Sequence, residues 1–573
     1  MNKEVIHIIS LLNQNEKFKL CLNTLFNFLG IFLEMLALSL IIPIFRIIFF
    51  DDLFPNFFLT NYLYQLSLEL NLNFKFIILS LFILLFCLKN FLLIIFSYFN
   101  LKFINLLCIR LSKDLFSLYL KQGYNFFLSS DSNNILRKVT TDINGVKNFL
   151  VSIQVLLVEF LFIFFLSILL FYTNQKIFIF IAIFFTSIFF IYLKIVRKKI
   201  IGWSTLFQFN TGNLQTLVGS AIKGIKDIFV YNLQEDFVKK FLNFSKNSYL
   251  PSFKQDFINT ILRFWMELLA IFAIVSPMIF FLLTERELSK LLPLFALFVV
   301  SIFKVMPSIN RLLSSYQSLK YYKISSNLIF NEFSLLKKDF RISDTNIVFN
   351  KSIEFKNVSF FYDNNADTII KNLDFRIDKG ECIAILGENG TGKSTLLNLI
   401  SGLLKPSSGS VLLDNVEQEI YSNKYWIKKI SYIQQNIFLL NESIKKNIIL
   451  EREDLFNEKK FDEVKQILSL DRAFNKFSSK LETVVGDDGL FLSGGQKQLI
   501  SIARALYKNS EIILFDEADS FLDSHYTLNL KDLFLKLKNR VTIVVVTHDT
   551  SLLNESFDRV FKINNHNVSQ IIK

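Results

Sequence analysis

The chain has 573 residues, a formal net charge of +13, and a composition that is 52% hydrophobic with 67 Phe and only 20% charged residues. This balance excludes an entirely soluble protein, because only a lipid bilayer would supply apolar solvent for so much apolar surface. The positive charges are scattered beside apolar runs and form no basic stripe, which indicates cytoplasmic loops of a membrane protein and no nucleic-acid partner.

Six hydrophobic segments precede residue 325, and each can supply the ~20 apolar residues that cross a bilayer. They are residues 19–50, 74–100, 147–173, 176–197, 257–283 and 291–316. The N-terminus and the connections at 101–146, 194–256 and 317–350 are rich in Lys and Arg, whereas the other connections are short or not basic. The positive-inside bias therefore places both termini in the cytoplasm and predicts a membrane all-α six-helix transmembrane domain over residues 1–325.

The two long connections have helical apolar spacing but lack the unbroken hydrophobicity of a span. We expect the neighbouring spans to continue as helices into the cytoplasm and to end in short turns, with candidates at 132–143 and 224–237. Another segment, residues 53–70, is too polar to span but is rich in Phe, Tyr and Leu. It predicts either a helix at the outer membrane interface or a cap on the bundle.

Basic residues lie inside the predicted spans, where a charge near the bilayer centre costs roughly 2.5–3.5 kcal/mol on insertion scales. They are Lys89, Arg263, Lys304 and Arg311. Lys304 and Arg311 are seven residues apart, which puts them two helical turns apart on one face. If this face lines a cavity, the four residues predict a binding site for an anionic head group such as a phosphate or pyrophosphate.

A structural role for the same charges stays open. Arg263 can pair with Glu267 one helical turn away, and Lys89 can extend its ammonium group toward the interface. Glu34 and Glu159, which also lie in predicted spans, are candidate counter-charges.

After about residue 340, short β-rich runs alternate with helical stretches, which is typical of a parallel α/β domain. We predict a linker over residues 326–345 and a cytoplasmic α/β P-loop nucleotide-binding domain over 346–573.

The stretch "GENGTGKS" fits the phosphate-loop pattern G-x-x-x-x-G-K-[ST] and lies between a strand-like and a helix-like segment. Glycines let backbone N–H groups wrap phosphate oxygens, Lys393 reaches the terminal phosphates, and Ser394 binds Mg²⁺. The predicted ATP-binding residues of this loop are Gly387, Glu388, Asn389, Gly390, Thr391, Gly392, Lys393, Ser394 and Thr395.

The apolar run in "EIILFDEADS" (511–520) is followed by two acids at the expected end of a buried strand. Asp516 is placed to hold Mg²⁺ through water, and Glu517 to orient and deprotonate the attacking water. Alone, this pattern fits an ordinary strand end. Together with the phosphate loop it predicts an ATPase that uses ATP and Mg²⁺.

The stretch "LSGGQKQLISIARAL" (492–506) resembles the signature of ABC transporter ATPases. In that family the signature residues close over the γ-phosphate of ATP bound to the opposite subunit. The matching residues are Ser493, Gly494, Gly495 and Gln496. Because this chain has one such domain, the resemblance implies a homodimer.

Further motifs of this family follow in order. Tyr362 resembles the aromatic residue that stacks on adenine, Asp523 the D-loop aspartate, and His548 the switch histidine. Gln435 resembles the Q-loop glutamine. The resemblance implies the catalytic residues Lys393, Gln435, Glu517 and His548, and the metal-binding residues Ser394, Gln435 and Asp516. Phe515 and Asp549 depart from the common pattern without removing a catalytic group.

The order of six spans and one ATPase domain resembles exporter-type half-transporters over the whole chain. The segments 30–45, 132–143, 263–270 and 304–322 look like bacterial flippases of lipid-linked oligosaccharides. This resemblance implies an anionic polyprenyl-pyrophosphate glycan moved to the outer leaflet of the cytoplasmic (inner) membrane of a bacterium. Export of a peptide or hydrophobic drug is the main alternative, and an ATP-gated channel or regulatory subunit is a more distant one.

Overall fold

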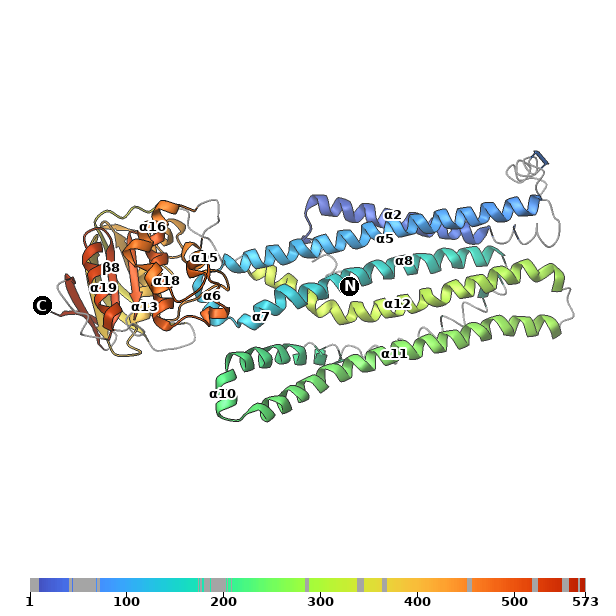
Figure 1. The fold of residues 1–573 in the computed structure, drawn as a ribbon. Coiled ribbons are helices and arrows are strands. Elements are labelled where there is room, and N and C mark those ends of the chain that lie inside the picture. Colours follow the sequence, from blue (N-terminus) through green and yellow to red (C-terminus); the bar gives the residue numbers. More distant parts are fainter. Residues whose placement is uncertain are drawn as a thin grey trace. The chain divides into compact units, whose positions relative to one another are not determined.

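The protein is described by a computed structural model with two compact units (Figure 1). It describes residues 10–40, 44, 68–69, 73–173, 175, 178–179, 186, 202–203, 205–207, 209–283, 288–336, 345–362, 368–450, 456–517, 524–548, 556–564 and 567–571. The first unit comprises Met1–Leu120 and Ser130–Asp339, and the second comprises Lys121–Ser129 and Phe340–Lys573. The second unit thus includes a short segment from the middle of the helical part of the sequence.

The first unit consists of helices among its described residues. They are α2 (Gln14–Ser39), α5 (Phe74–Leu120), α7 (Ser132–Arg137), a π-helical turn (Lys138–Asp142), α8 (Ile143–Thr173), α10 (Ile225–Val230), α11 (Gln234–Leu283) and α12 (Leu288–Leu336). Helices α5, α11 and α12 contain 47, 50 and 49 residues. At 1.5 Å per residue each is about 70 Å long, more than twice the ~30 Å hydrocarbon core. Each of these helices is therefore longer than a single membrane crossing requires.

Within the described part of this unit, three helical stretches are long and apolar enough to cross a bilayer: Gln14–Ser39, Phe74–Leu120 and Ser132–Tyr172. Large apolar side chains on them face outward, as Phe91, Ile94 and Phe160 do with 60–67% exposure. Such outward apolar surface fits lipid contact. The predicted spans 257–283 and 291–316 are helical within α11 and α12.

Two membrane predictions fall largely outside the described residues. These are the span at 176–197 and the interfacial segment at 53–70. The predicted first span, 19–50, is described as helix only to Ser39 in α2.

The first predicted turn, 132–143, is wrong. These residues form α7 and the π-helical turn, which lead directly into α8. The break comes earlier, because α5 ends at Leu120 and a short helix α6 (Tyr124–Ser129) follows Gly123. Asp131 then caps α7 by accepting a hydrogen bond from the Asn133 N–H. The second candidate turn, 224–237, does contain a break between α10 and α11, where Asn232 has a positive φ.

The second unit contains a six-stranded sheet in the order β10-β9-β3-β8-β7-β6 and an antiparallel sheet in the order β2-β1-β4-β5. The strands are β1 (Ser352–Phe360), β2 (Ile370–Asp378), β3 (Cys382–Gly387), β4 (Ser408–Leu413), β5 (Val416–Glu417), β6 (Ile430–Ile433), β7 (Ile512–Asp516), β8 (Thr542–Thr547), β9 (Arg559–Asn564) and β10 (Asn567–Ile571). All pairs in the larger sheet are parallel except β9 with β10. The carboxyl ends of β3, β6, β7 and β8 therefore share one edge.

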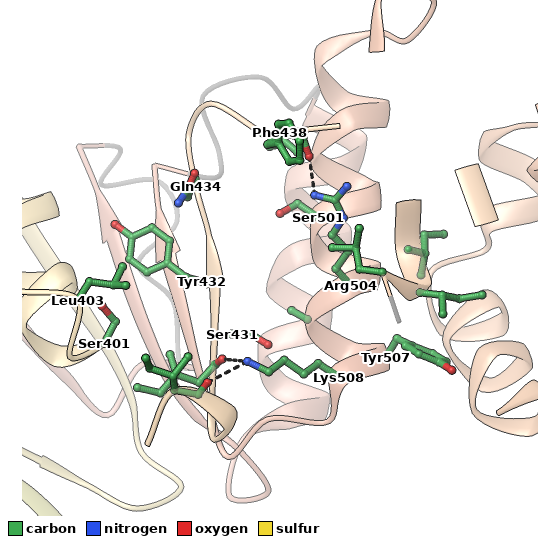
Figure 2. Close-up of a pocket in the computed structure, with 17 residues that line it drawn as sticks. Ser401, Leu403, Ser431, Tyr432, Gln434, Phe438, Ser501, Arg504, Tyr507 and Lys508 are labelled. Carbon is green, nitrogen blue, oxygen red and sulfur yellow. Dashed lines mark hydrogen bonds between the residues drawn. The ribbon is translucent and has the colours of Figure 1, made fainter. Parts of the chain in front are cut away.

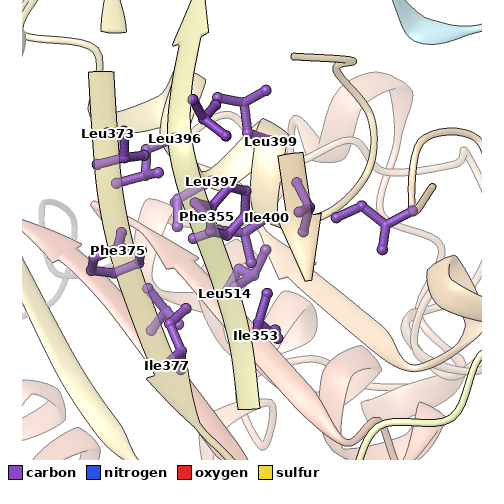
Figure 3. Close-up of a cluster of buried hydrophobic side chains, with 14 of the residues drawn as sticks. Ile353, Phe355, Leu373, Phe375, Ile377, Leu396, Leu397, Leu399, Ile400 and Leu514 are labelled. Carbon is purple, nitrogen blue, oxygen red and sulfur yellow. The ribbon is translucent and has the colours of Figure 1, made fainter. Parts of the chain in front are cut away.

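The described helices of this unit are α6, α13 (Lys393–Ile400), α14 (Lys424–Lys428), α15 (Ile444–Ile449), α16 (Glu458–Ile467), α17 (Leu470–Ala473), α18 (Gly494–Lys508) and α19 (Ser524–Leu537). Strands β7 and β8 are buried at every position, as expected for a parallel sheet covered on both faces. Figure 3 shows one core cluster, in which Leu396 and Ile400 of α13 pack among Phe355 of β1 and other apolar residues. This packing fixes the start of α13 relative to the sheet.

The predicted linker, 326–345, is partly helical. Helix α12 continues to Leu336, and the boundary between the two units falls at Asp339 and Phe340.

Replacing Gly409, in strand β4, tests how closely this strand packs against its neighbour β1. Gly409 has a φ of +85°, and a Cβ there would lie 2.4 Å from the backbone oxygen of Asn357. We expect Gly409→Ala to lower the midpoint of thermal unfolding of the detergent-purified protein. Gly380→Ala is the matched control, because Gly380 has a φ of +82° but its nearest neighbour would be 3.4 Å away. The Gly380→Ala variant should lower the free energy of unfolding by only ~1–2 kcal/mol, which is the cost of a left-handed backbone in a residue with a Cβ. Equal losses in both variants would contradict the clash.

Candidate functional site

The predicted phosphate loop joins the end of β3 to the start of α13. Gly390 and Gly392 have φ values of +83° and +95°, which side chains with a Cβ rarely adopt. A Cβ on Gly392 would also lie 2.9 Å from Ile369 Cγ2. Glu388, Asn389 and Gly390 of this loop are all exposed. The glycines therefore permit a tight turn that directs backbone N–H groups and the N-terminus of α13 to one place.

Lys393 is buried at the centre of this turn. Its ammonium group donates hydrogen bonds to the backbone oxygens of Gly387 (2.9 Å) and Glu388 (3.0 Å). It also lies 3.4 Å from Glu517 Oε1. The Thr391 hydroxyl donates to the same Glu388 oxygen at 2.8 Å and holds the loop closed.

Asp516, the last residue of β7, receives a hydrogen bond on each carboxylate oxygen. The Ser394 hydroxyl donates to Oδ1 at 3.1 Å, and the Tyr432 hydroxyl donates to Oδ2 at 2.9 Å. Burial raises the pKa of the Asp516 carboxyl, although both hydrogen bonds and the Lys393 charge oppose this shift. Hydroxyl and carboxylate oxygens side by side are the hard donors that Mg²⁺ prefers, so this pair fits the predicted metal site.

Glu517 has a strained backbone, with a φ of +49° that non-glycine residues rarely adopt. Its N–H donates to the Val546 oxygen of β8 at 3.0 Å, which holds this conformation. The carboxylate then accepts a hydrogen bond from Gln435 Nε2 at 3.0 Å and faces Lys393. The structure thus brings together the predicted pair Gln435 and Glu517 from sequence positions 82 residues apart.

The structure describes two of the three remaining predicted residues of this nucleotide site. Tyr362 follows β1, and its hydroxyl lies 3.4 Å from the hydroxyl of Thr395, while its ring packs edge-on against Phe360. His548 follows β8 and is exposed. Asp523 lies outside the described residues.

The signature segment begins α18. Ser493 caps this helix and forms a capping box with Gln496, in which each side chain bonds the other residue's backbone N–H. Gln496 Nε2 also donates to the Ala473 oxygen at 3.2 Å. Ser493 and Gly494 are exposed, so an exposed helix N-terminus is available to an anion from another molecule.

Sequence reasoning missed Tyr432. It lies on β6, three residues before Gln435, and reaches Asp516 because β6 pairs with β7 in parallel. The strand neighbours could not be read from the sequence, since more than 80 residues separate Tyr432 from Asp516.

A pocket of about 550 Å³ lies between β6 and α18 (Figure 2). Arg504 donates to the oxygen of Phe438 at 2.7 Å and to Asn447 Oδ1 at 3.0 Å, and Lys508 donates to the Ile427 oxygen at 3.0 Å. Burial lowers the pKa of Arg504 to about 10. These cations thus bind protein oxygens of the pocket walls. Tyr432, the hydrogen-bond partner of Asp516, also lines this pocket.

Three of the basic residues predicted inside the spans are paired with acids in the structure. Lys304 Nζ lies 2.5 Å from Glu34 Oε1, and Lys89 Nζ lies 3.7 Å from the same oxygen. Arg311 donates to Glu159 Oε1. The expectation that Glu34 and Glu159 are counter-charges is therefore confirmed.

A cavity of about 240 Å³ lies beside these pairs in the membrane unit. Glu34, Glu159, Lys304 and Arg311 all line it, as does Ser308. The Arg311 side chain is 54% exposed, whereas that of Lys89 is 5% exposed and packs over the Phe86 ring. The Lys89 side chain is thus buried in the structure. The side chain of Arg263 lies outside the described residues.

The comparisons with known proteins agree with these observations. The ABC transporter family model matches residues 370–520, and the ABC transporter transmembrane region matches residues 20–315. Two relatives described as ATP-dependent lipid A-core flippases, from Escherichia coli (strain K12) and Wigglesworthia glossinidia brevipalpis, are each 26% identical to this chain. The alignments cover 75% and 78% of this chain and 74% and 77% of those proteins.

A solved structure of a bacterial Atm1-family ABC exporter with ATP bound superposes with a TM-score of 0.74 at 18% identity, over 96% of this chain and 94% of that chain. This likeness shows the exporter fold. Because the transmembrane-region match alone covers more than half of the 573 residues, the chain belongs to the ABC transporter family and is an ATP-driven membrane transporter.

Proposed function

We propose that this transporter is a homodimer that hydrolyses Mg-ATP to move an anionic lipid from the cytoplasmic to the outer leaflet of a bacterial inner membrane. Both termini then lie in the cytoplasm. The most specific substrate that we propose is a polyprenyl-pyrophosphate-linked oligosaccharide. The observation that carries this proposal is the cavity in the membrane unit that Lys304 and Arg311 line with their paired acids.

The cavity favours an anionic head group for an electrostatic reason. Three cations, Lys89, Lys304 and Arg311, face two carboxylates, Glu34 and Glu159, so the cluster has a formal excess of one positive charge. Unpaired charge at this depth is costly, and a phosphate group would compensate it. Arg311 is the most exposed member and offers a planar fork of donors that suits phosphate oxygens. Apolar surface beside the cavity would accept the lipid chain.

In the nucleotide site we propose that Lys393 exchanges its loop carbonyl partners for the terminal phosphates of ATP. Ser394, Asp516 and Gln435 would hold Mg²⁺, which neutralises charge on the phosphates. Glu517, oriented by Gln435 and by its strained backbone, would deprotonate the attacking water. Tyr362 would stack on adenine, and His548 and Asp523 would complete the site at the dimer interface.

The exposed signature segment would close each site from the partner subunit. Ser493 and the N-terminus of α18 would meet the γ-phosphate held by the partner's phosphate loop. ATP would then bind more tightly to the closed dimer than to the open one, and this difference in affinity drives the change of access in the membrane unit.

Replacing Glu517 by Gln tests the catalytic assignment. We expect ATP hydrolysis in proteoliposomes to fall by about 100-fold or more, because the general base is lost. ATP binding should persist, since a glutamine side chain has nearly the same size as the glutamate that it replaces. Glu458→Gln changes an exposed acid at the start of α16 and should hydrolyse ATP at the normal rate. Retained hydrolysis in Glu517→Gln would refute the assignment.

Co-expression of two inactive chains tests the shared site. One chain has Lys393→Ala, and the other has Ser493→Arg. In the mixed dimer, the unchanged phosphate loop of one chain meets the unchanged signature of the other, so one complete site forms. We therefore expect tandem-tagged mixed dimers to regain ATP hydrolysis that neither homodimer shows. If each site were built from a single chain, the mixed dimer would stay inactive.

Replacing Lys304 and Arg311 by Gln tests the head-group site. Loss of one charge-assisted hydrogen bond to the substrate should slow ATP-dependent flipping of a polyprenyl-pyrophosphate oligosaccharide by about tenfold in each variant. Basal ATP hydrolysis should be kept. Lys102→Gln, which changes a lysine of α5 outside the cavity lining, is the control. Normal flipping in all variants would refute the head-group role, and export of a peptide or drug would then become the better hypothesis.

A further inference from the structure

Tyr432 forms the second hydrogen bond to the proposed metal ligand. Its hydroxyl donates to Asp516 Oδ2 at 2.9 Å, whereas the Ser394 hydroxyl donates to Oδ1 at 3.1 Å. The two donors come from different elements, β6 and α13, and each binds a different oxygen of the carboxylate. With both oxygens held, the carboxylate plane cannot rotate without breaking a hydrogen bond.

The hydroxyl of Tyr432 is suited to this role, because a phenol keeps its proton at neutral pH and can donate it in a hydrogen bond to a carboxylate. The ring also packs against the core cluster that contains Leu396 and Leu514, so its direction is fixed by the fold. Tyr432 is therefore a rigid and permanent donor.

Tyr432 lines one wall of the pocket between β6 and α18. Figure 2 shows Tyr432 on the β6 side of the pocket, across from Ser501 and Arg504 of α18.

We propose that Tyr432 is a positioning residue that orients Asp516 for Mg²⁺. This inference rests on the proposed function, because it assumes that Asp516 and Ser394 hold Mg²⁺. Groups that donate hydrogen bonds to a metal-binding side chain fix its orientation. Their loss typically lowers the metal affinity by about 10–100-fold.

The test measures metal binding directly. Mn²⁺ replaces Mg²⁺ as the probe, and its binding to the full-length protein, saturated with a non-hydrolysable ATP analogue, is followed by electron paramagnetic resonance. We expect Tyr432→Phe to raise the Kd of Mn²⁺ about tenfold. The rate of ATP hydrolysis should recover at high Mg²⁺, which a merely structural defect would not produce. Tyr507→Phe is the matched control, because that buried hydroxyl bonds the Asn457 N–H.

Two further variants, Asp516→Asn and Ser394→Ala, separate the possible failures. Normal Mn²⁺ binding in Tyr432→Phe would overturn the positioning role. If Asp516→Asn and Ser394→Ala weaken Mn²⁺ binding in the same series, only this inference fails. If they too bind Mn²⁺ normally, the proposed metal site itself is wrong.

Discussion

The parallel pairing of β3, β8 and β7 is the constraint on which the nucleotide site depends. Parallel strands end at one edge, so Gly387 at the end of β3 and Asp516 at the end of β7 meet there although 128 intervening residues separate them in sequence. The same pairing lets Val546 of β8 hold the backbone of Glu517 in its strained conformation. The sheet thus brings the separate parts of the site together.

The membrane unit obeys a second constraint, which is the cost of burying charge. Each described cation of its cavity has a carboxylate partner on another helix, as Lys304 has in Glu34. One acid nevertheless serves two lysines, because Glu34 also faces Lys89. Pairing therefore makes the charges tolerable in an apolar environment while leaving the cluster short of one negative charge. An anionic head group bound there, as we propose, would balance the remaining positive charge.

The sequence predicts those features that depend on local spacing. The phosphate loop, the acidic strand end and the signature each occupy a short stretch, and their glycines and acids have direct physical reasons. Contacts across strands and helices could not be predicted in the same way. The bond from Tyr432 to Asp516 depends on the strand order, and the pair Glu34 and Lys304 depends on helices separated by 270 residues. The turn predicted at 132–143 shows another limit. The helical spacing of those residues was real, because they form α7 and the π-helical turn, and the actual break lies earlier, near Gly123.

The length of the helices has a mechanical consequence. A helix about 70 Å long that tilts as a rigid rod by about 5° moves its far end by about 6 Å, close to one helical pitch. Helices α5, α11 and α12 can therefore act as levers, in which a small rotation at one end becomes a displacement comparable to the width of a side chain at the other. The bending stiffness of these three helices, more than any local rearrangement, would determine how much of that displacement reaches the far end.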